Sequence, residues 1–320
     1  MKALVTGATG FIGSHLCAEL AKRGHQVTCL IREKSDLKWV ENIDVKLITG
    51  DCKSLDSLFP AVTDTDYVFH LAGLTKACSL DDFFCTNTKG TENLIRAVAE
   101  KSPKIKRFVY LSSLAAAGPS NNGYPLTEDA EPRPVSSYGR SKLEGEKAVL
   151  NYKDTIPITI LRPSAVYGPR DRDFFIFFKV LKKGVFPYWG KCYYSLLYVD
   201  DLVQGIILAA ESKRAKGEVY FLADSKFYTN DEIVDAMSSA LDARAIRLRV
   251  PKFIMPFFAY VVERIKKEGI INRDKMNELR HSHWICDIKK AKEELGFIPK
   301  VGIKEGMKWT ADWYRIHRWL

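Results

Sequence analysis

The stretch MKALVTGATGFIG, residues 1–13, decides how the rest of the chain is interpreted. Residues 2–6 form a short apolar run, which predicts a buried strand. Three glycines follow at intervals of three, and a helical pattern of apolar residues extends over 11–23. Gly24 then stands where glycine commonly ends a helix. The stretch therefore predicts a strand, a tight glycine turn and an amphipathic helix.

Glycines at this spacing are typical of a turn that binds phosphate. They permit a tight turn, close approach of the backbone to a pyrophosphate, and close packing of helix on strand. The helix that follows offers free N–H groups and a partial positive charge to the phosphates. A glycine-rich turn without a ligand is the alternative, but the flanking strand and helix favour a dinucleotide site. The predicted cofactor-binding residues of this turn are Gly7, Thr9, Gly10, Phe11, Ile12 and Gly13.

The end of the second predicted strand, 26–31, indicates which dinucleotide is bound. NAD sites usually place an acid there, to bind the adenosine ribose hydroxyls. This chain has Arg32 at that point, and its first acid is Glu33. An arginine can pair with a 2′-phosphate or stack on adenine, although it can also be a solvated loop residue. The sequence therefore favours NADP as the cofactor, with NAD as the alternative.

Strands and helices alternate through the first half of the chain. Further strands are expected at 45–49, 67–71, 107–112 and 156–161, with long helices at 81–100 and 137–152. Alternation of this kind implies βαβ units and a parallel sheet that is covered on both faces. The predicted fold class is α/β, a doubly wound parallel (Rossmann) sheet.

The regular alternation of strands and helices ends after Gly168. Helices are expected at 173–184, 199–210 and 229–241, an extended segment at 191–197 and a strand at 218–222. We therefore expect a dinucleotide-binding domain at 1–168, to which 199–223 returns. Residues 169–198 and 224–320 are expected to form a smaller, mainly helical substrate-binding lobe over the C-terminal edge of the sheet, where ligands of such folds bind.

A tyrosine and a lysine stand four residues apart near the start of the helix at 137–152. This spacing places the Tyr138 phenol and the Lys142 ammonium on one helical face. A nearby ammonium lowers the pKa of a phenol, which then exchanges a proton with an alcohol or carbonyl. Ser113 follows a central strand, so its hydroxyl should emerge beside this helix and bond the reacting oxygen. The predicted catalytic residues are Ser113, Tyr138 and Lys142; the alternatives are a chance Tyr/Lys spacing and a capping serine.

Composition limits the remaining possibilities. The 320 residues are 46% hydrophobic and carry a net charge of +10, with the basic residues spread along the chain rather than gathered in a stripe. Such a distribution favours a solvated surface over nucleic acid or membrane binding. The seven cysteines form no C-x-x-C pair, so we expect neither a metal site nor a disulfide framework. We also expect no signal peptide and no transmembrane segment, hence a cytoplasmic protein.

Taken together, these features resemble the extended short-chain dehydrogenase/reductase family, of the NAD(P)-dependent epimerase/dehydratase type. The resemblance covers nearly the whole chain. Its motifs are the 7–13 loop, Gly50-Asp51, His70-Leu71-Ala72-Gly73, Asn87, Leu111-Ser112-Ser113, Tyr138 with Lys142, Arg162-Pro163 with Val166-Tyr167-Gly168-Pro169-Arg170, and Tyr198-Val199-Asp200-Asp201.

The resemblance implies roles for particular positions. Asp51 would bind the adenine amino group, and Lys142 the nicotinamide ribose, beside Tyr138. Residues 163–166 would face the carboxamide. Such enzymes often dimerise through the helices at 81–100 and 137–152, so a homodimer is expected. The further cofactor-binding residues that it implies are Asp51, Leu71, Ala72, Gly73, Asn87, Tyr138, Lys142, Pro163 and Val166.

Two departures from the family pattern concern the substrate. Sugar-nucleotide epimerases carry an Asn and an Arg that grip the diphosphate, at the positions where this chain has Ala165 and Tyr194. Losing both removes the charge-assisted contacts that hold phosphate best. Aromatic residues between 174 and 194, and the apolar segment 250–258, predict an apolar pocket instead. This pattern is similar to the dihydroflavonol reductase and 3β-hydroxysteroid dehydrogenase branches.

Three interpretations of function follow. The first is an NADP(H)-dependent oxidoreductase of a lipophilic secondary alcohol or ketone, with Tyr138 as general acid/base. The second is a sugar-nucleotide epimerase, dehydratase or reductase, in which Arg170, Arg172 and Lys191 supply other phosphate contacts. The third is a non-catalytic NADP-sensing protein, against which the intact Ser113, Tyr138 and Lys142 set argues.

Overall fold

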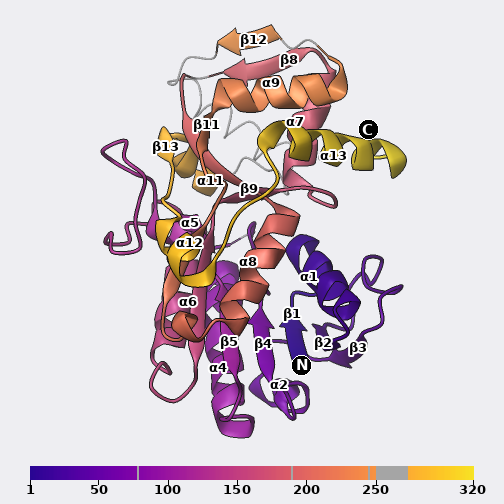
Figure 1. Cartoon of the computed structure of the whole chain (residues 1–320), viewed down its shortest axis with the longest axis vertical. Helices are drawn as coiled ribbons and strands as arrows, with labels where there is room; N and C mark the ends of the chain where they lie inside the picture. The colour runs from indigo at the N-terminus through magenta and orange to yellow at the C-terminus, as the bar shows by residue number, and fades with distance from the viewer. Residues whose placement is uncertain (78, 189, 244–245, 250–272) are drawn as a thin grey trace.

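A seven-stranded parallel sheet forms the centre of the larger part of the molecule (Figure 1). The computed structural model describes residues 1–77, 79–188, 190–243, 246–249 and 273–320. The strand order is β10-β6-β5-β4-β1-β2-β3, which confirms the predicted doubly wound α/β fold. The strands are β1 (Lys2–Thr6), β2 (Gln26–Ile31), β3 (Lys46–Thr49), β4 (Tyr67–His70), β5 (Arg107–Leu111), β6 (Ile158–Pro163) and β10 (Val219–Leu222).

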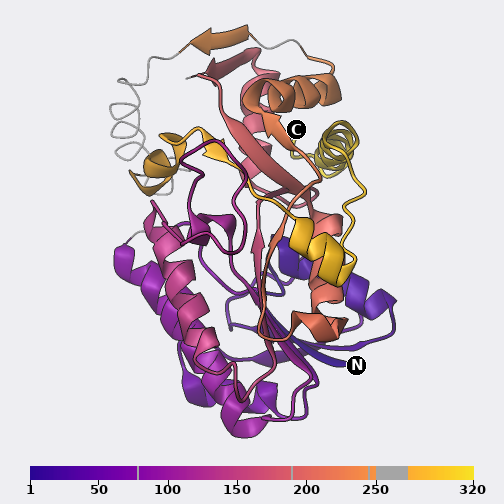
Figure 2. The ribbon, with the colours of Figure 1, turned by 60° about the vertical axis from the view of Figure 1, so that its left-hand side comes forward.

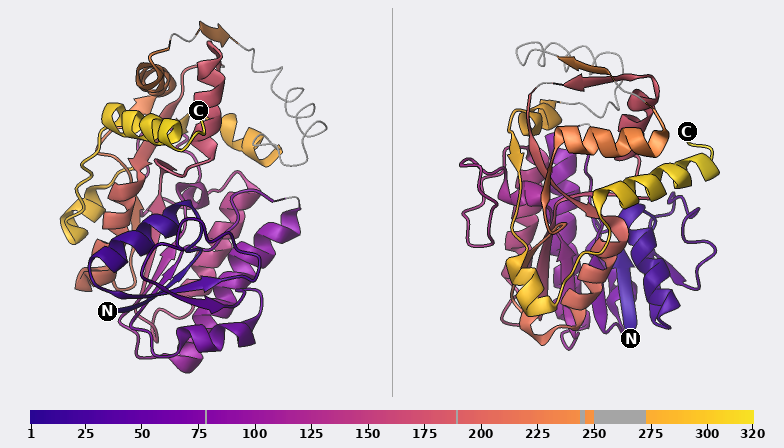
Figure 3. Two further views of the ribbon diagram at one scale, coloured as in Figure 1. Left: turned by 90° about the vertical axis from the view of Figure 1, so that its right-hand side faces the viewer. Right: turned by 45° about the horizontal axis from the view of Figure 1, so that its top comes forward.

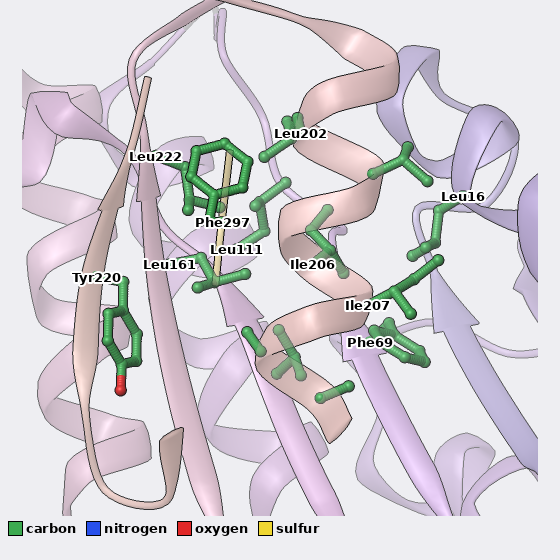
Figure 4. Close-up of a cluster of buried hydrophobic side chains, with 14 of the residues drawn as sticks. Leu16, Phe69, Leu111, Leu161, Leu202, Ile206, Ile207, Tyr220, Leu222 and Phe297 are labelled. Atoms are coloured by element: carbon green, nitrogen blue, oxygen red, sulfur yellow. The ribbon is translucent and has the colours of Figure 1, made fainter. Parts of the chain in front are cut away.

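Helices cover both faces of this sheet (Figure 2). One face is covered by α1 (Phe11–Lys22), α8 (Val199–Glu211) and α12 (Lys289–Leu295), and the other by α2 (Leu55–Val62), α4 (Gly90–Lys101) and α6 (Ser137–Leu150). Figure 4 shows the first of these cores, where Ile206 and Ile207 of α8 lie over the strands. Phe297 packs there too, so the segment 288–297, expected in the smaller lobe, lies against the large sheet. Burial of these apolar side chains stabilises the fold by about 25 cal/mol for each Å² of apolar surface removed from water.

The helix expected at 81–100 is interrupted by a π-turn. It consists of α3 (Leu80–Phe83), the π-helical η1 (Phe84–Lys89) and α4. Ser79 caps its start, because its hydroxyl accepts the Asp82 N–H at 3.2 Å while the Asp82 carboxylate accepts the Ser79 N–H. π-turns often occur at functional sites. This one contains Asn87, which lies beneath the site described below.

The smaller lobe is built around β9 (Tyr193–Tyr198). It contains two small sheets as well as helices, so it is only partly helical. In the first, β9 pairs with β7 (Ala165–Tyr167), β11 (Phe227–Thr229) and β13 (His283–Trp284); in the second, β8 (Val185–Tyr188) pairs with β12 (Ile246–Arg249). Its longer helices are α7 (Asp173–Lys182), α9 (Asn230–Leu241) and α13 (Ile303–Ile316). The short elements of the chain are α5 (Leu114–Ala117), η2 (Lys213–Ala215) and α11 (Arg273–Leu279).

The smaller lobe lies over the C-terminal edge of the large sheet (Figure 3). Its own core joins α7, α9, α13 and β9, with Phe178 and Tyr314 fully buried. Among the described residues, no helix is both long enough and apolar enough to cross a bilayer. The site that the sequence predicts therefore falls between the sheet edge and the lobe.

Candidate active site

The predicted site residues follow the C-terminal ends of adjacent strands. The registers place Thr6 beside His70, and His70 beside Tyr110, so β1, β4 and β5 end at one edge. Arg32 follows β2 at this edge, and Ser113 follows β5. These two strands are three strand spacings apart, roughly 14 Å at about 4.8 Å per strand. The predicted site residues therefore extend along this edge, with Arg32 at one end and Ser113 at the other.

The glycine turn fits a dinucleotide pyrophosphate. Gly7 has φ of +70°, and a Cβ there would lie 2.7 Å from the Ala72 nitrogen, so no other residue fits without displacement. A Cβ at Gly13 would lie 2.1 Å from the Gly7 oxygen. Gly10 precedes α1 without any side-chain cap, which leaves the first N–H groups of the helix available to an anion. The turn is thus closely packed, while the start of α1 has the donors that a phosphate needs.

The loop after β4 carries Leu71, Ala72 and Gly73, and Asn87 holds it in place. The Asn87 side chain accepts the Leu74 N–H at 2.7 Å and donates to the Leu74 carbonyl at 2.9 Å and to the Ser141 hydroxyl at 2.9 Å. Both amide protons are therefore used within the protein. The predicted contact of Asn87 with the cofactor stays a prediction; the contacts that the structure gives it support the loop that lines the predicted site.

Arg32 and Asp51 lie together at the β2–β3 end of the edge. The Arg32 side chain is exposed, and its charge acts on the thiol of Cys52, next to Asp51. The Asp51 carboxylate accepts the Lys53 N–H at 2.9 Å, which fixes the turn that follows β3. The exposed Arg32 guanidinium is therefore not engaged in the protein core.

Tyr138 and Ser113 meet at the opposite end of the edge. Ser136 caps α6 by accepting the Gly139 N–H at 3.0 Å, and Tyr138 lies in the first turn. Gly139 brings that turn against the residues after β5, because a Cβ there would lie 2.2 Å from the Ala115 oxygen. Burial raises the pKa of Tyr138 to about 12, while its hydrogen bond with the Ser113 side chain opposes this rise. The phenol is therefore protonated near neutral pH.

Lys142 lies one turn further along α6 and is buried. Its Nζ is 4.3 Å from the centre of the Tyr110 ring, a cation–π contact. Burial lowers the pKa of Lys142 to about 7, and the nearby Glu146 carboxylate opposes this effect. The His70 ring stacks on Tyr110, with 5.5 Å between ring centres, and burial lowers the pKa of His70 to about 3. His70 is thus neutral, and Lys142 titrates close to neutral pH.

A buried ion pair that the sequence analysis missed supports this helix. Glu146 of α6 binds Arg162 of β6 through two hydrogen bonds, of 2.9 Å and 2.6 Å, and also accepts the Ser112 hydroxyl at 2.5 Å. Both charged side chains are almost fully buried. A signal existed in the sequence, since Glu146 follows Lys142 by four residues on the same helical face.

Two carboxylates from α11 reach the start of α6, and no local sequence signal pointed to them. Asp274 accepts the N–H groups of Ser137 at 2.5 Å and Tyr138 at 3.0 Å. Glu278 accepts the hydroxyl of the capping Ser136 at 2.8 Å. These acceptors lie more than 130 residues away from their donors along the chain.

Ala165 and Tyr194, the two departures from the pattern of sugar-nucleotide epimerases, have different surroundings. Ala165 begins β7, next to Pro163 and Val166, and its side chain is exposed at the sheet edge. Tyr194 lies half-buried on β9, paired with Tyr228 of β11. An amide at position 165 would be open to a ligand, whereas this chain presents only a methyl group there.

The aromatic residues expected to form a pocket are partly core. Phe178 is fully buried, and Phe175 packs on Tyr314 and Trp319 at 5.2 Å each. Phe174, Phe177 and Phe186 form a chain of ring contacts at 6.0 Å and 6.2 Å, with Phe177 partly exposed. This chain starts next to Asp173, whose charge acts on the Tyr138 phenol. Trp189 and the segment 250–258 lie outside the described residues.

Known proteins of several activities are similar to this chain. Relatives include a 2-alkyl-3-oxoalkanoate reductase of Shewanella oneidensis (27% identical; 96% of this chain, 84% of the relative), a ceramide reductase of Caulobacter vibrioides (28%; 99% and 95%) and a UDP-glucose 4-epimerase of Vibrio cholerae (28%; 97% and 94%). The solved structure of gox2253 matches with a TM-score of 0.84 at 25% identity, over 99% of this chain and 98% of that one. MoeE5 in complex with UDP-glucuronic acid and NAD matches with 0.81 at 25%, over 99% and 100%.

The model of the NAD dependent epimerase/dehydratase family matches residues 3–223, which include the glycine turn, Ser113, Tyr138 and Lys142. This match confirms the resemblance that the motifs predicted. The chain belongs to the NAD-dependent epimerase/dehydratase family of extended short-chain dehydrogenases/reductases and is an NAD(P)-dependent enzyme.

Proposed function

We propose that this enzyme is an NADP(H)-dependent oxidoreductase that reduces the ketone, or oxidises the secondary alcohol, of a lipophilic substrate. The observation that supports the reaction type is the hydrogen bond of Tyr138 with Ser113, just after β5, with Lys142 one turn further along the same helix. Bound at the glycine turn, the dinucleotide would supply or accept the hydride. The side chains of this protein would handle the proton.

In the reductive direction Tyr138 is the proton donor. Its raised pKa keeps the phenol protonated, so the phenol can donate to the oxygen of a carbonyl as the carbonyl carbon receives hydride. The Ser113 hydroxyl, which also accepts the Ala115 N–H at 3.1 Å, bonds the same oxygen. The ammonium of Lys142 stabilises the phenolate that remains, until a proton from solvent restores the phenol.

The substrate class follows from the missing phosphate contacts. Ala165 offers neither charge nor amide, and burial of a diphosphate beside it would leave charge uncompensated. Phe174, Phe177 and Phe186 extend apolar surface away from the site. Relatives named 2-alkyl-3-oxoalkanoate reductase and ceramide reductase support a substrate with long apolar parts.

A second candidate function is conversion of a sugar nucleotide. The relative named UDP-glucose 4-epimerase and the structure of MoeE5 with UDP-glucuronic acid favour it. Arg172 and Lys191 are exposed, so both are available to a phosphate. Because an epimerase regenerates its own cofactor, this candidate also predicts turnover without net oxidation of NADPH.

A ligand panel separates the two candidates. The purified protein, with NADP⁺ bound, is heated with lipophilic cyclic and long-chain ketones or alcohols, and separately with UDP- and dTDP-sugars. Ligands that bind the folded state raise the Tm. We expect stabilisation by lipophilic compounds, followed by NADPH oxidation with the corresponding ketones. Stabilisation by a nucleotide sugar, with none by any lipophilic compound, would contradict the proposal and favour the second candidate.

A further inference from the structure

The start of α6 is held by an element of the smaller lobe. A helix begins with four N–H groups that lack partners within the helix. In α6, the Asp274 carboxylate accepts two of them, those of Ser137 and Tyr138, and the Ser136 hydroxyl accepts that of Gly139. Glu278 in turn holds Ser136. The turn that carries the proton donor is therefore fixed largely by α11, which lies beside the upper end of α6 in Figure 1.

These contacts are of a strong kind. A hydrogen bond from an N–H to a carboxylate is charge-assisted and about twice as strong as a neutral one. A negative charge at a helix N-terminus also interacts favourably with the helix dipole. Two oxygens of one carboxylate on successive N–H groups define the orientation of the backbone at Tyr138. A small shift of α11 would consequently move the phenol.

The lobe, in turn, positions α11. The Trp284 indole N–H donates to the Glu278 carbonyl at 3.0 Å, which ties the end of α11 to β13. β13 pairs with β9, the central strand of the lobe, through Tyr193 and Trp284. Met276 of α11 is buried. A continuous set of contacts therefore links the lobe sheet, through β13 and α11, to the start of α6.

Charges around Tyr138 add an electrostatic effect. Glu278 of α11 and Asp173 of α7 face the phenol and raise its pKa, the Ser113 hydroxyl lowers it, and Lys142 lies on the same helix. Both carboxylates belong to the smaller lobe. The position of this lobe thus influences both the orientation and the proton affinity of Tyr138.

We propose that Asp274 and Glu278 are positioning residues, through which the smaller lobe aligns Tyr138 for proton transfer. This inference rests on the proposed function for the role of Tyr138, but the contact itself does not depend on the substrate. Displacement of a reacting group by about 1 Å costs on the order of 100-fold in rate. Loss of the Asp274 contacts should accordingly lower kcat rather than raise KM.

The test uses the full-length protein and the variants Asp274→Ala, Asp274→Asn and Glu278→Gln, with Asn277→Ala as a control on the same helix. Amide exchange of Ser137 and Tyr138 is measured first, because it needs no substrate. We expect faster exchange in Asp274→Ala and partial protection in Asp274→Asn, which keeps one acceptor. Should Asp274→Ala fail to fold, Asp274→Asn provides the comparison.

Turnover is then measured with whichever substrate the ligand panel identifies, lipophilic or sugar nucleotide. We expect kcat of Asp274→Ala to fall about ten- to a hundredfold with KM little changed. Glu278→Gln removes a negative charge, so the pKa of Tyr138 should fall and alcohol oxidation should begin at lower pH. Unchanged exchange in Asp274→Ala, or faster exchange with kcat within twofold of wild type, would overturn the inference. A sugar-nucleotide substrate would overturn only the proposed function.

Discussion

The surroundings of Tyr138 raise the pKa of its phenol above the ordinary value for tyrosine. Burial and two carboxylates favour the neutral phenol, and the Ser113 hydroxyl favours the phenolate. Lys142 is close to its own titration midpoint at neutral pH. In the proposed mechanism, a phenol kept neutral in this way is available as a proton donor, and the lysine charge stabilises the phenolate that remains.

Replacement of Tyr138 by Phe removes the proton donor and leaves the helix intact. We expect turnover to fall on the order of 10²–10⁴-fold, the usual contribution of general acid–base catalysis. Binding of NADPH, followed by its fluorescence, should be unchanged. Lys142→Met should lose turnover and also bind the cofactor more weakly. Wild-type turnover in Tyr138→Phe would show that another group moves the proton.

The pH dependence should differ between the two directions. Lys142 has a pKa of about 7, so its ammonium is lost as the pH rises above that value. Ketone reduction needs that charge to stabilise the phenolate of Tyr138, and its kcat should decline on the alkaline side. Alcohol oxidation needs the deprotonated phenol and should increase over the same range. Initial rates between pH 6 and 9, with Lys142→Met as the comparison, provide the check.

Arg32 is predicted to select NADP over NAD. An arginine binds a phosphate through a charged, bidentate contact, and the exposed Arg32 guanidinium follows β2 at the predicted adenosine end. NADPH should therefore bind more tightly than NADH, and Arg32→Ala should reduce the difference about tenfold or more, equivalent to about 1.5 kcal/mol. Fluorescence titrations with both cofactors measure it. Equal affinities in the wild-type protein would remove Arg32 from the site.

At the scale of elements, α6 is held at three points along its length. Asp274 and Ser136 bind its first turn, Gly139 allows close packing on the segment after β5, and Glu146 joins it to β6 through Arg162. Each contact comes from a different element. The helix that carries Tyr138 and Lys142 is consequently held in place by tertiary contacts as well as by its own backbone hydrogen bonds.

Removing the charge of one partner of the Glu146–Arg162 pair should destabilise the protein more than replacing both partners by apolar residues. The two side chains are 6% and 2% exposed, so removal of one partner leaves an uncompensated buried charge. We expect Glu146→Gln to cost about 3–5 kcal/mol, measured by urea unfolding. The double variant Glu146→Leu with Arg162→Met should recover much of this loss, because two apolar side chains leave no buried charge. A double variant less stable than the single one would contradict this explanation.

At the scale of the whole molecule, an aromatic clasp joins the two parts of the chain. We define it as Trp39, between β2 and β3, with Trp313, His317 and Trp319 of the C-terminal region. Trp39 lies 5.5 Å from Trp313, 6.4 Å from His317 and 6.5 Å from Trp319, between ring centres. Arg170, which follows β7, lies over the Trp39 ring at 5.2 Å. The end of the chain thereby packs on the segment next to the predicted adenosine site.

Trp39→Ala should weaken the attachment of the C-terminal region. A large aromatic side chain contributes several kcal/mol when fully buried, and for the half-buried Trp39 we expect about 2 kcal/mol. Chemical unfolding monitored by fluorescence measures this loss. Trp309→Ala, on the same helix as Trp313 but with 43% of its side chain exposed, is the matched control. An equal loss in both variants would mean that the clasp adds nothing specific.

The sequence by itself determined the features that depend on local pattern. The glycine spacing, the alternation of apolar runs with helical periods and the Tyr138/Lys142 pair are short-range signals, because strand and helix formation follow local periodicity. They were enough to predict the doubly wound sheet, and together with the other motifs they carry the resemblance to the family. The π-turn within 81–100 was not predicted, since Asn87 bonds Leu74 and Ser141 only after the loop and α6 have come together.

The groups that surround Tyr138 depend on contacts between distant parts of the chain. Asp274 and Glu278 are separated from the start of α6 by more than 130 residues, and Trp39 from the C-terminal tryptophans by more than 270. Nothing in a local window links such residues, because their contact depends on how the lobe folds back over the sheet edge. Burial has the same origin: a pKa of about 7 for Lys142 and about 12 for Tyr138 requires the removal of water by surrounding elements. Local sequence shows that Tyr138 and Lys142 are present, whereas the packing of surrounding elements sets the pKa values of their side chains.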